Sequence, residues 1–390
     1  MKIERSTGMK RYTQELWQSF LMAGAAKTIM LGEVADHLYV SPPGQPLSRK
    51  ETVEYAAVSG FGDDIRNAAE EIYESPETVM PYGEIARLMS PEAFMDGVMD
   101  AVIGHTALYD AEIVRRNPYY QCVRPKTARS GSLQLAMRDT LPYEFIQSYH
   151  KRHDRNDPFF VSDIGFFTER VAFSALLEKD RVWMSIVMSE IESMEEGIRM
   201  AHGNVVTYGL GLGYYAFMAA QKPEVEKVTA VELSPDVIHL FKTHILPQFP
   251  HPEKIEIVEG DAYEFLQHQK DGAFDVGYAD FWAGVLDGPE LYLKFLPLTK
   301  RFTHTAFEYW IETVFIDLYF RPAVMALLME RVLDRTVNWP HETKSFQAME
   351  TSFARWVGRS PFTISTPHDV DALLTPERLT ALVREWAMQQ

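Results

Sequence analysis

A glycine-rich turn is the sharpest chemical signal in this sequence. Gly209, Gly211 and Gly213 follow the short apolar segment 205–208 and precede a helical pattern that begins near Tyr214. Glycine at such positions lets a ligand approach the backbone closely and lets the turn adopt dihedral angles that a Cβ would forbid. The dinucleotide fingerprint G-x-G-x-x-G requires glycine at position 214, so the spacing disfavours a pyrophosphate-bearing cofactor such as NAD.

Acidic residues end the next three predicted strands. Glu232 lies 19 residues after Gly213, where a carboxylate can accept hydrogen bonds from both hydroxyls of a ribose. Asp261 ends the following strand, where a carboxylate can accept a hydrogen bond from the exocyclic amine of adenine. Asp280 ends the strand after that and is followed by two aromatic residues. These side chains predict a nucleoside site.

Short apolar strands alternate with helices from residue 204 onward. The strands are predicted at 205–208, 228–231, 255–258, 274–278 and 303–307. This alternation predicts an α/β fold with a Rossmann-like, doubly wound, mostly parallel sheet. Ligands bind such sheets outside the carboxyl ends of the strands, so we expect the glycine turn and the three acids to share one pocket.

Helical patterns flank this sheet on both sides in the sequence. Apolar residues recur at spacings of three and four from about Arg11 to Arg116, and helical patterns return after Glu308. A β-hairpin is predicted at 171–186. The predicted domains are an all-helical N-terminal domain at 1–157, the hairpin with the Rossmann-like domain at 158–310, and a helical C-terminal extension at 311–390.

Composition narrows the classes of partner. The chain has 38 Lys and Arg against 55 Asp and Glu, a net charge of −17, so its field repels phosphate backbones and anionic membranes. We expect neither nucleic acid nor membrane as a partner. Cys122 is the only cysteine, which excludes an internal disulfide and a cysteine-rich zinc site.

The sequence also bears on metal binding and on cellular location. His150 and His153 lie three residues apart in a charged segment, a pattern typical of solvated histidines, and we expect no metal site. No run approaches the roughly 18 to 20 apolar residues of a membrane span, and the start of the chain has no apolar core of a signal peptide. We expect a cytoplasmic protein and leave its oligomeric state open, a homo-oligomer included.

The glycine turn and the three acids together resemble the class I, Rossmann-like S-adenosylmethionine-dependent methyltransferases. The resemblance covers about residues 171–308. It implies that the turn holds the methionine part of the cofactor S-adenosylmethionine, that Glu232 holds the ribose and that Asp261 with Ala262 faces the adenine. Thr207 stands where many members carry an acid. The cofactor-binding residues implied are Tyr208, Gly209, Leu210, Gly211, Gly213, Tyr214, Glu232, Leu233, Asp261, Ala262 and Asp280.

Within that superfamily the chain is most similar to the spermidine synthase branch. The resemblance rests on the hairpin and helix before the glycine turn, on 260–262, and on Asp280 followed by 288–289. Those enzymes transfer an aminopropyl group from decarboxylated S-adenosylmethionine, using paired acids that hold and deprotonate an amine. Asp280 matches the first acid, the second is missing, and Leu212 replaces the acid inside the glycine turn.

We therefore interpret the chain as an S-adenosylmethionine-dependent methyltransferase acting on a small molecule or a peptide side chain. Asp280 is the candidate for orienting or deprotonating the acceptor, and Phe281 and Trp282 are candidate substrate contacts. His304 and Glu308, near the end of the fifth strand, are further candidate proton acceptors. Two alternatives stay open: an aminopropyltransferase and a non-catalytic, nucleoside-binding scaffold.

Overall fold

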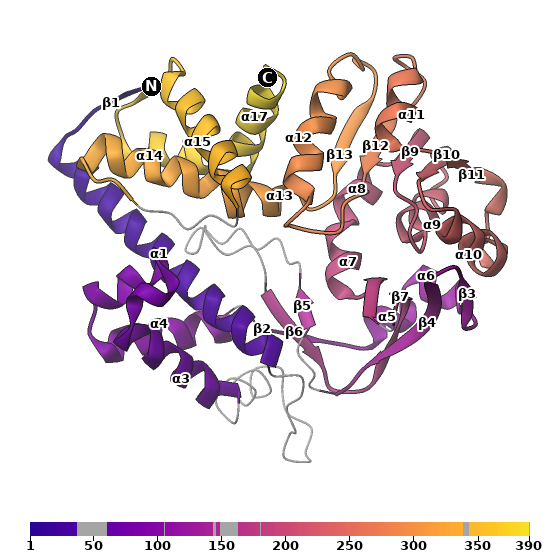
Figure 1. Cartoon of the computed structure of the whole chain (residues 1–390), viewed down its shortest axis with the longest axis horizontal. Coiled ribbons are helices and arrows are strands. Elements are labelled where there is room, and N and C mark those ends of the chain that lie inside the picture. Colours follow the sequence, from indigo (N-terminus) through magenta and orange to yellow (C-terminus); the bar gives the residue numbers. More distant parts are fainter. Residues whose placement is uncertain are drawn as a thin grey trace. The chain divides into compact units, whose positions relative to one another are not determined.

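The computed structural model describes residues 1–36, 61–104, 106–142, 146–148, 163–179, 181–337 and 343–389 (Figure 1). The chain divides into two compact units. One, termed the helical unit, comprises Met1–Leu108, Lys151–Gly165 and Glu312–Gln390. The other, termed the sheet unit, comprises Tyr109–His150 and Phe166–Ile311. Each unit is described by itself.

The sheet unit contains a five-stranded parallel sheet, as predicted. Its strand order is β11-β10-β9-β12-β13, so β9, the first strand of this sheet in chain order, lies at its centre (Figure 1). All four residues of β12 are buried, as expected for a central strand covered on both faces. The strands are β9 (Gly203–Tyr208), β10 (Val225–Glu232), β11 (Ile255–Glu259), β12 (Val276–Ala279) and β13 (Ala306–Tyr309).

Helices connect these parallel strands and begin at capped positions. The Ser234 side chain accepts a hydrogen bond from the Val237 N–H at 3.3 Å, and Pro235 follows it at the first helical position. Asp261 caps the next helix in the same way. The connections are α9 (Tyr214–Ala220), α10 (Pro235–Leu240), η3 (Phe241–Ile245), η4 (Leu246–Gln248), η5 (Pro252–Lys254), α11 (Ala262–His268) and α12 (Gly288–Thr299). Because the strands are parallel, their carboxyl ends and the helix starts meet at one edge.

A second, antiparallel sheet precedes the glycine turn in the chain. It has the order β3-β4-β7-β8 and contains the predicted hairpin, formed by β7 and β8. Its strands are β3 (Ala128–Ser130), β4 (Leu133–Thr140), β7 (Val171–Glu178) and β8 (Arg181–Ser185). Short elements around it are α5 (Glu112–Arg116), α6 (Pro118–Cys122), β5 (Ile146–Ser148), α7 (Met188–Ser193) and α8 (Glu195–Met200).

The structure differs here from the all-helical prediction for residues 1–157. Strand β4 pairs with β7 along its whole length, from Leu133 opposite Glu178 to Thr140 opposite Val171. A two-stranded hairpin is only marginally stable alone, so β7 and β8 take a third strand from earlier in the chain. Residues 109–150 consequently belong to the sheet unit rather than to an N-terminal helical domain.

The helical unit combines both ends of the chain. Helix α1 packs against α4 and α14, and β1 pairs in parallel with β14. The predicted N-terminal helices and C-terminal extension therefore form one unit. Its elements are β1 (Lys2–Ile3), α1 (Thr7–Asp36), α3 (Phe61–Glu74), η1 (Pro76–Val79), η2 (Tyr82–Leu88), α4 (Pro91–Gly104), α13 (Glu312–Phe315), η6 (Ile316–Phe320), α14 (Arg321–Leu333), α15 (Lys344–Arg359), β14 (Thr363–Ile364), α16 (Pro367–Leu374) and α17 (Pro376–Ala387).

Two strands, β2 (Thr106–Tyr109) and β6 (Asp163–Phe167), lie where the chain passes from one unit to the other. Among the helices that the structure describes, none combines the length and the apolar character needed to span a membrane.

Candidate functional site

The turn after β9 requires glycine on steric grounds. Gly209, Gly211 and Gly213 have φ of 100°, 50° and 73°, which side chains other than glycine rarely adopt. A Cβ on Gly209 would collide with the backbone carbonyl oxygen of Asp280, and one on Gly213 would collide with the Phe241 ring. The turn thus lies directly against the residue that ends β12.

Glu232, at the end of β10, is hydrogen-bonded to this turn. Its Oε2 accepts hydrogen bonds from the backbone N–H of Leu210 at 3.0 Å and, at 3.5 Å, from that of Gly211. Its Oε1 accepts one from the N–H of Ser234 at 2.8 Å. A carboxylate offers about four lone-pair positions, so this arrangement orients Glu232 and still leaves acceptor capacity for ligand hydroxyls.

Asp261 performs a similar structural task at the end of β11. Its Oδ1 accepts hydrogen bonds from the N–H groups of Tyr263 at 2.9 Å and Glu264 at 3.0 Å, which caps α11. The other oxygen, Oδ2, has no hydrogen bond to any residue that the structure describes. A fixed carboxylate with one available oxygen suits recognition of an amine.

These features line one cavity of about 600 Å³ in the sheet unit. That volume falls within the roughly 300 to 1,000 Å³ typical of small-molecule pockets. Trp183 of β8, Glu190 of α7 and Trp310 complete its walls. The predicted residues that line it are Gly209, Gly211, Glu232, Leu233, Asp261, Ala262, Asp280, Phe281 and Trp282.

Three other predicted residues, Leu210, Gly213 and Tyr214, line a smaller cavity of about 40 Å³. It shares Glu190, Asp280 and part of the glycine turn with the large cavity. The prediction for Tyr208 differs from the structure, because this residue lines neither cavity. Its side chain is fully buried, with its ring 5.0 Å from that of Phe295 in the core.

Asp280 and Glu190 are carboxyl groups with raised pKa values. Burial, and then the charge of Glu232, raise the pKa of Asp280 to about 7. Burial, and then the charge of Asp280, raise the pKa of Glu190 to about 8. Carboxyl groups that titrate near neutral pH can exchange protons with a bound molecule.

Sequence reasoning missed Glu190. The residue lies in α7, before β9, and only the packing of that helix at the sheet edge brings it to Asp280. In the sequence, Glu190 is not distinguished from other polar residues of predicted helices. The one available signal was its place in the helical segment that precedes β9 and the glycine turn in the chain.

The loop after Asp280 is ordered by another acid. The Asp287 carboxylate accepts hydrogen bonds from the N–H groups of Ala283 and Gly284, each at 2.9 Å. Trp310 is held in turn by a hydrogen bond from its Nε1 to the Ser193 Oγ at 2.8 Å. The wall formed by the loop and the tryptophan is therefore built by specific polar contacts.

The remaining candidates lie elsewhere. His304 is 77% exposed at its side chain and contacts Asp271, and neither it nor Glu308 lines either cavity of the sheet unit. His150 and His153 fall outside the described residues. Within the described ranges, no group of three or more His, Cys, Asp and Glu side chains could hold a metal ion.

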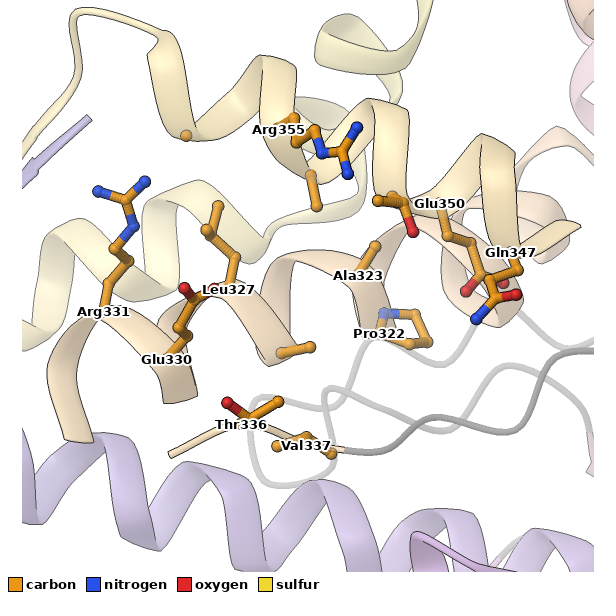
Figure 2. A pocket seen from close by; sticks show the side chains of 14 residues that line it. Pro322, Ala323, Leu327, Glu330, Arg331, Thr336, Val337, Gln347, Glu350 and Arg355 are labelled. Carbon is orange, nitrogen blue, oxygen red and sulfur yellow. The ribbon is translucent and has the colours of Figure 1, made fainter. Parts of the chain in front are cut away.

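A separate cavity of about 500 Å³ lies in the helical unit, between α14 and α15 (Figure 2). Ala323 and Leu327 extend from α14, and Glu350 and Arg355 extend from α15 (Figure 2). Burial raises the pKa of Glu350 to about 8. None of the residues that the sequence singled out lines this cavity.

Comparison with known proteins identifies no family. No family model matches the chain, and no curated protein does. Solved structures match part of it. Spermidine synthase from Thermotoga maritima is 15% identical over 38% of this chain and 58% of its own, with a TM-score of 0.28.

A probable spermidine synthase from Corynebacterium glutamicum is 15% identical over 41% of this chain and 63% of its own, with a TM-score of 0.30. The YcgJ protein from Bacillus subtilis is 17% identical over 28% of this chain and 45% of its own, with a TM-score of 0.23. The matched part of this chain thus covers less than two thirds of the length of the Thermotoga maritima and Corynebacterium glutamicum proteins.

Proposed function

We propose that the sheet unit binds S-adenosylmethionine in the 600 Å³ cavity and transfers its methyl group to a small molecule or a peptide side chain. The observation that supports this most is the lining of a single cavity by the glycine turn, Glu232 and Asp261. Each lies at the carboxyl edge of the parallel sheet, where ligands of such folds bind.

The residues present fit this cofactor. Glu232 has acceptor capacity for the ribose hydroxyls, and Asp261 with Ala262 lies at the next strand end, where the adenine would be held. Gly209 and Gly211 bring the backbone of the glycine turn to the cavity wall, where the methionine part could approach it closely.

The bound cofactor would supply an activated methyl group on a sulfonium. The chain then has to exclude water, align the acceptor and receive one proton from it. Asp280 is suited to that proton, because its pKa of about 7 allows it to be ionised before transfer and protonated after it. Phe281 and Trp282 would provide an apolar wall for the acceptor.

Calorimetric titration of the full chain with S-adenosylmethionine and S-adenosylhomocysteine tests the proposal. We expect both to bind with a stoichiometry of one per chain. A screen of acceptors with methyl-labelled cofactor then tests transfer. Absence of binding at millimolar ligand would contradict the cofactor assignment, whereas binding without transfer to any acceptor would favour the nucleoside-binding scaffold.

One observation favours aminopropyl transfer as a second candidate. Glu190 lies in the same cavity as Asp280 and supplies a second acid, which the sequence motif lacks. Incubation with putrescine and decarboxylated S-adenosylmethionine separates the two candidates. Release of methylthioadenosine would support aminopropyl transfer, and its absence together with methyl transfer to another acceptor would support the first proposal.

A further inference from the structure

The titratable side chains that line the large cavity are all acidic. Five carboxyl groups line it, and no Lys, Arg or His belongs to the lining among the described residues. They come from five different elements or strand ends and converge on the same space. These groups are Glu190, Glu232, Asp261, Asp280 and Asp287. Such a lining attracts a positively charged ligand more strongly than a neutral one and repels an anionic one.

Two of these acids respond to charge inside the cavity. Glu232 and Glu190 line the cavity together with Asp280. Besides burial, the charge of Glu232 opposes the ionisation of Asp280, and the charge of Asp280 opposes that of Glu190. Asp261 and Asp287, which line the cavity from α11 and from the loop before α12, add charge of the same sign. No basic group of the described lining compensates them, so a cation placed beside Asp280 would favour the ionised form of both Asp280 and Glu190.

The proposed cofactor changes its charge in the reaction. At neutral pH S-adenosylmethionine carries a sulfonium, an ammonium and a carboxylate, a net charge of about +1, and loss of the methyl group leaves S-adenosylhomocysteine with a net charge of about zero. The sulfur is bonded to C5′ of the ribose. Glu232, which would hold the ribose, lines the same cavity as Asp280, and its charge acts on Asp280.

We propose that Glu190 and Asp280 form a charge-sensing pair that binds the sulfonium form of the cofactor in preference to its demethylated product. This inference rests on the proposed function. The pair would release protons when the cation binds, and it would take up the proton that the acceptor loses once the cofactor no longer carries the positive charge. Methyl transfer thereby weakens the binding of the product and favours its exchange for new cofactor.

Calorimetry in two buffers measures the affinity of each ligand and the number of protons released when it binds. Titrations at pH 7 in phosphate and in Tris, whose ionisation enthalpies differ, give the number of protons released when each ligand binds. We expect S-adenosylmethionine to bind at least tenfold more tightly than S-adenosylhomocysteine and to release more protons. Glu190→Gln should lower both the affinity ratio and the proton release, and Glu259→Gln, at the end of β11 outside the cavity, should change neither.

The wild-type protein provides a second measurement that needs no variant. The ratio of the two affinities should rise from pH 6 to pH 8.5, because the pair is more fully ionised at higher pH and the neutral product gains nothing from this. Equal affinities with equal proton release, or a ratio that does not change with pH, would overturn the charge-sensing pair and leave the cofactor assignment intact. Binding of neither ligand would instead overturn the proposed function.

Discussion

The backbone N–H of Leu210 donates a hydrogen bond of 3.0 Å to the carboxylate of Glu232, which lies 22 residues later in the chain. This contact joins the glycine turn to the end of the neighbouring strand. The side chain proposed to hold the ribose is therefore oriented by the same backbone that is proposed to hold the methionine part. Such preorganisation lowers the entropic cost of binding a nucleoside.

Glu232→Ala should weaken the binding of S-adenosylhomocysteine by about 1 to 3 kcal/mol, because ligand hydroxyls lose a charged acceptor and the turn loses its anchor. Calorimetry measures the change. The matched control is Glu259→Ala: Glu259 lies opposite Glu232 in the sheet register, on an exposed position that does not line the cavity. Equal effects of the two substitutions would contradict the role of Glu232.

Gly209→Ala should destabilise the sheet unit by more than about 3 kcal/mol. The new Cβ would collide with the Asp280 carbonyl oxygen in addition to straining a residue whose φ is 100°. Gly272→Ala is the control, since Gly272 also has a positive φ, 78°, but open space around it. There we expect only about 1 kcal/mol. Urea unfolding followed by circular dichroism compares the two, and a similar loss for both would show that the contact with Asp280 is unimportant.

Asp280→Asn should stabilise the protein at alkaline pH. The pKa of Asp280 is about 7 in the folded chain and about 4 in an unfolded one, so between these values the folded state binds more protons and wild-type stability falls as pH rises. Asparagine removes this dependence. We expect little difference near pH 4 and a gain of about 1 to 3 kcal/mol at pH 8, measured by urea unfolding. A difference that is constant with pH would contradict the buried, protonated carboxyl.

Glu350→Gln tests whether ionisation of a buried carboxyl group also lowers stability in the helical unit. Burial raises the pKa of Glu350 to about 8, so its ionisation costs stability as pH rises from about 4.5 toward 8. The variant should melt at a higher temperature than the wild type at pH 8.5 and at nearly the same temperature at pH 5. With allowance for solvent screening, the gain corresponds to about 1 to 2 kcal/mol. Cofactor affinity should not change, and a loss of affinity would show that the helical unit takes part in binding.

Local patterns predicted the parallel sheet well. The apolar segment before Gly209 and the capped helix starts at Ser234 and Asp261 are signals within a few residues, and the structure has β9, α10 and α11 there. The ends of the later strands were less accurate, since β13 begins at Ala306 rather than at Thr303. Strand ends depend on pairing with neighbours, which a linear pattern does not contain.

Features that depend on distant parts of the chain could not be predicted in this way. Strand β4 is a strand because β7 pairs with it, and Glu190 joins the site because α7 packs at the sheet edge. Tyr208, in contrast, adjoins the glycine turn in sequence but does not line the cavity, because its ring lies in the core. Proximity in sequence to a motif therefore identified the turn but not every side chain around it.

Hydrogen exchange with and without S-adenosylhomocysteine tests most directly whether the cavity at the sheet edge is the nucleoside site. We predict slower exchange in the glycine turn at 209–213 and at the ends of β10 and β11, with no change in α14 and α15. Protection of α14 and α15 without protection of the turn would assign the ligand to the cavity in Figure 2 and contradict a nucleoside site at the sheet edge.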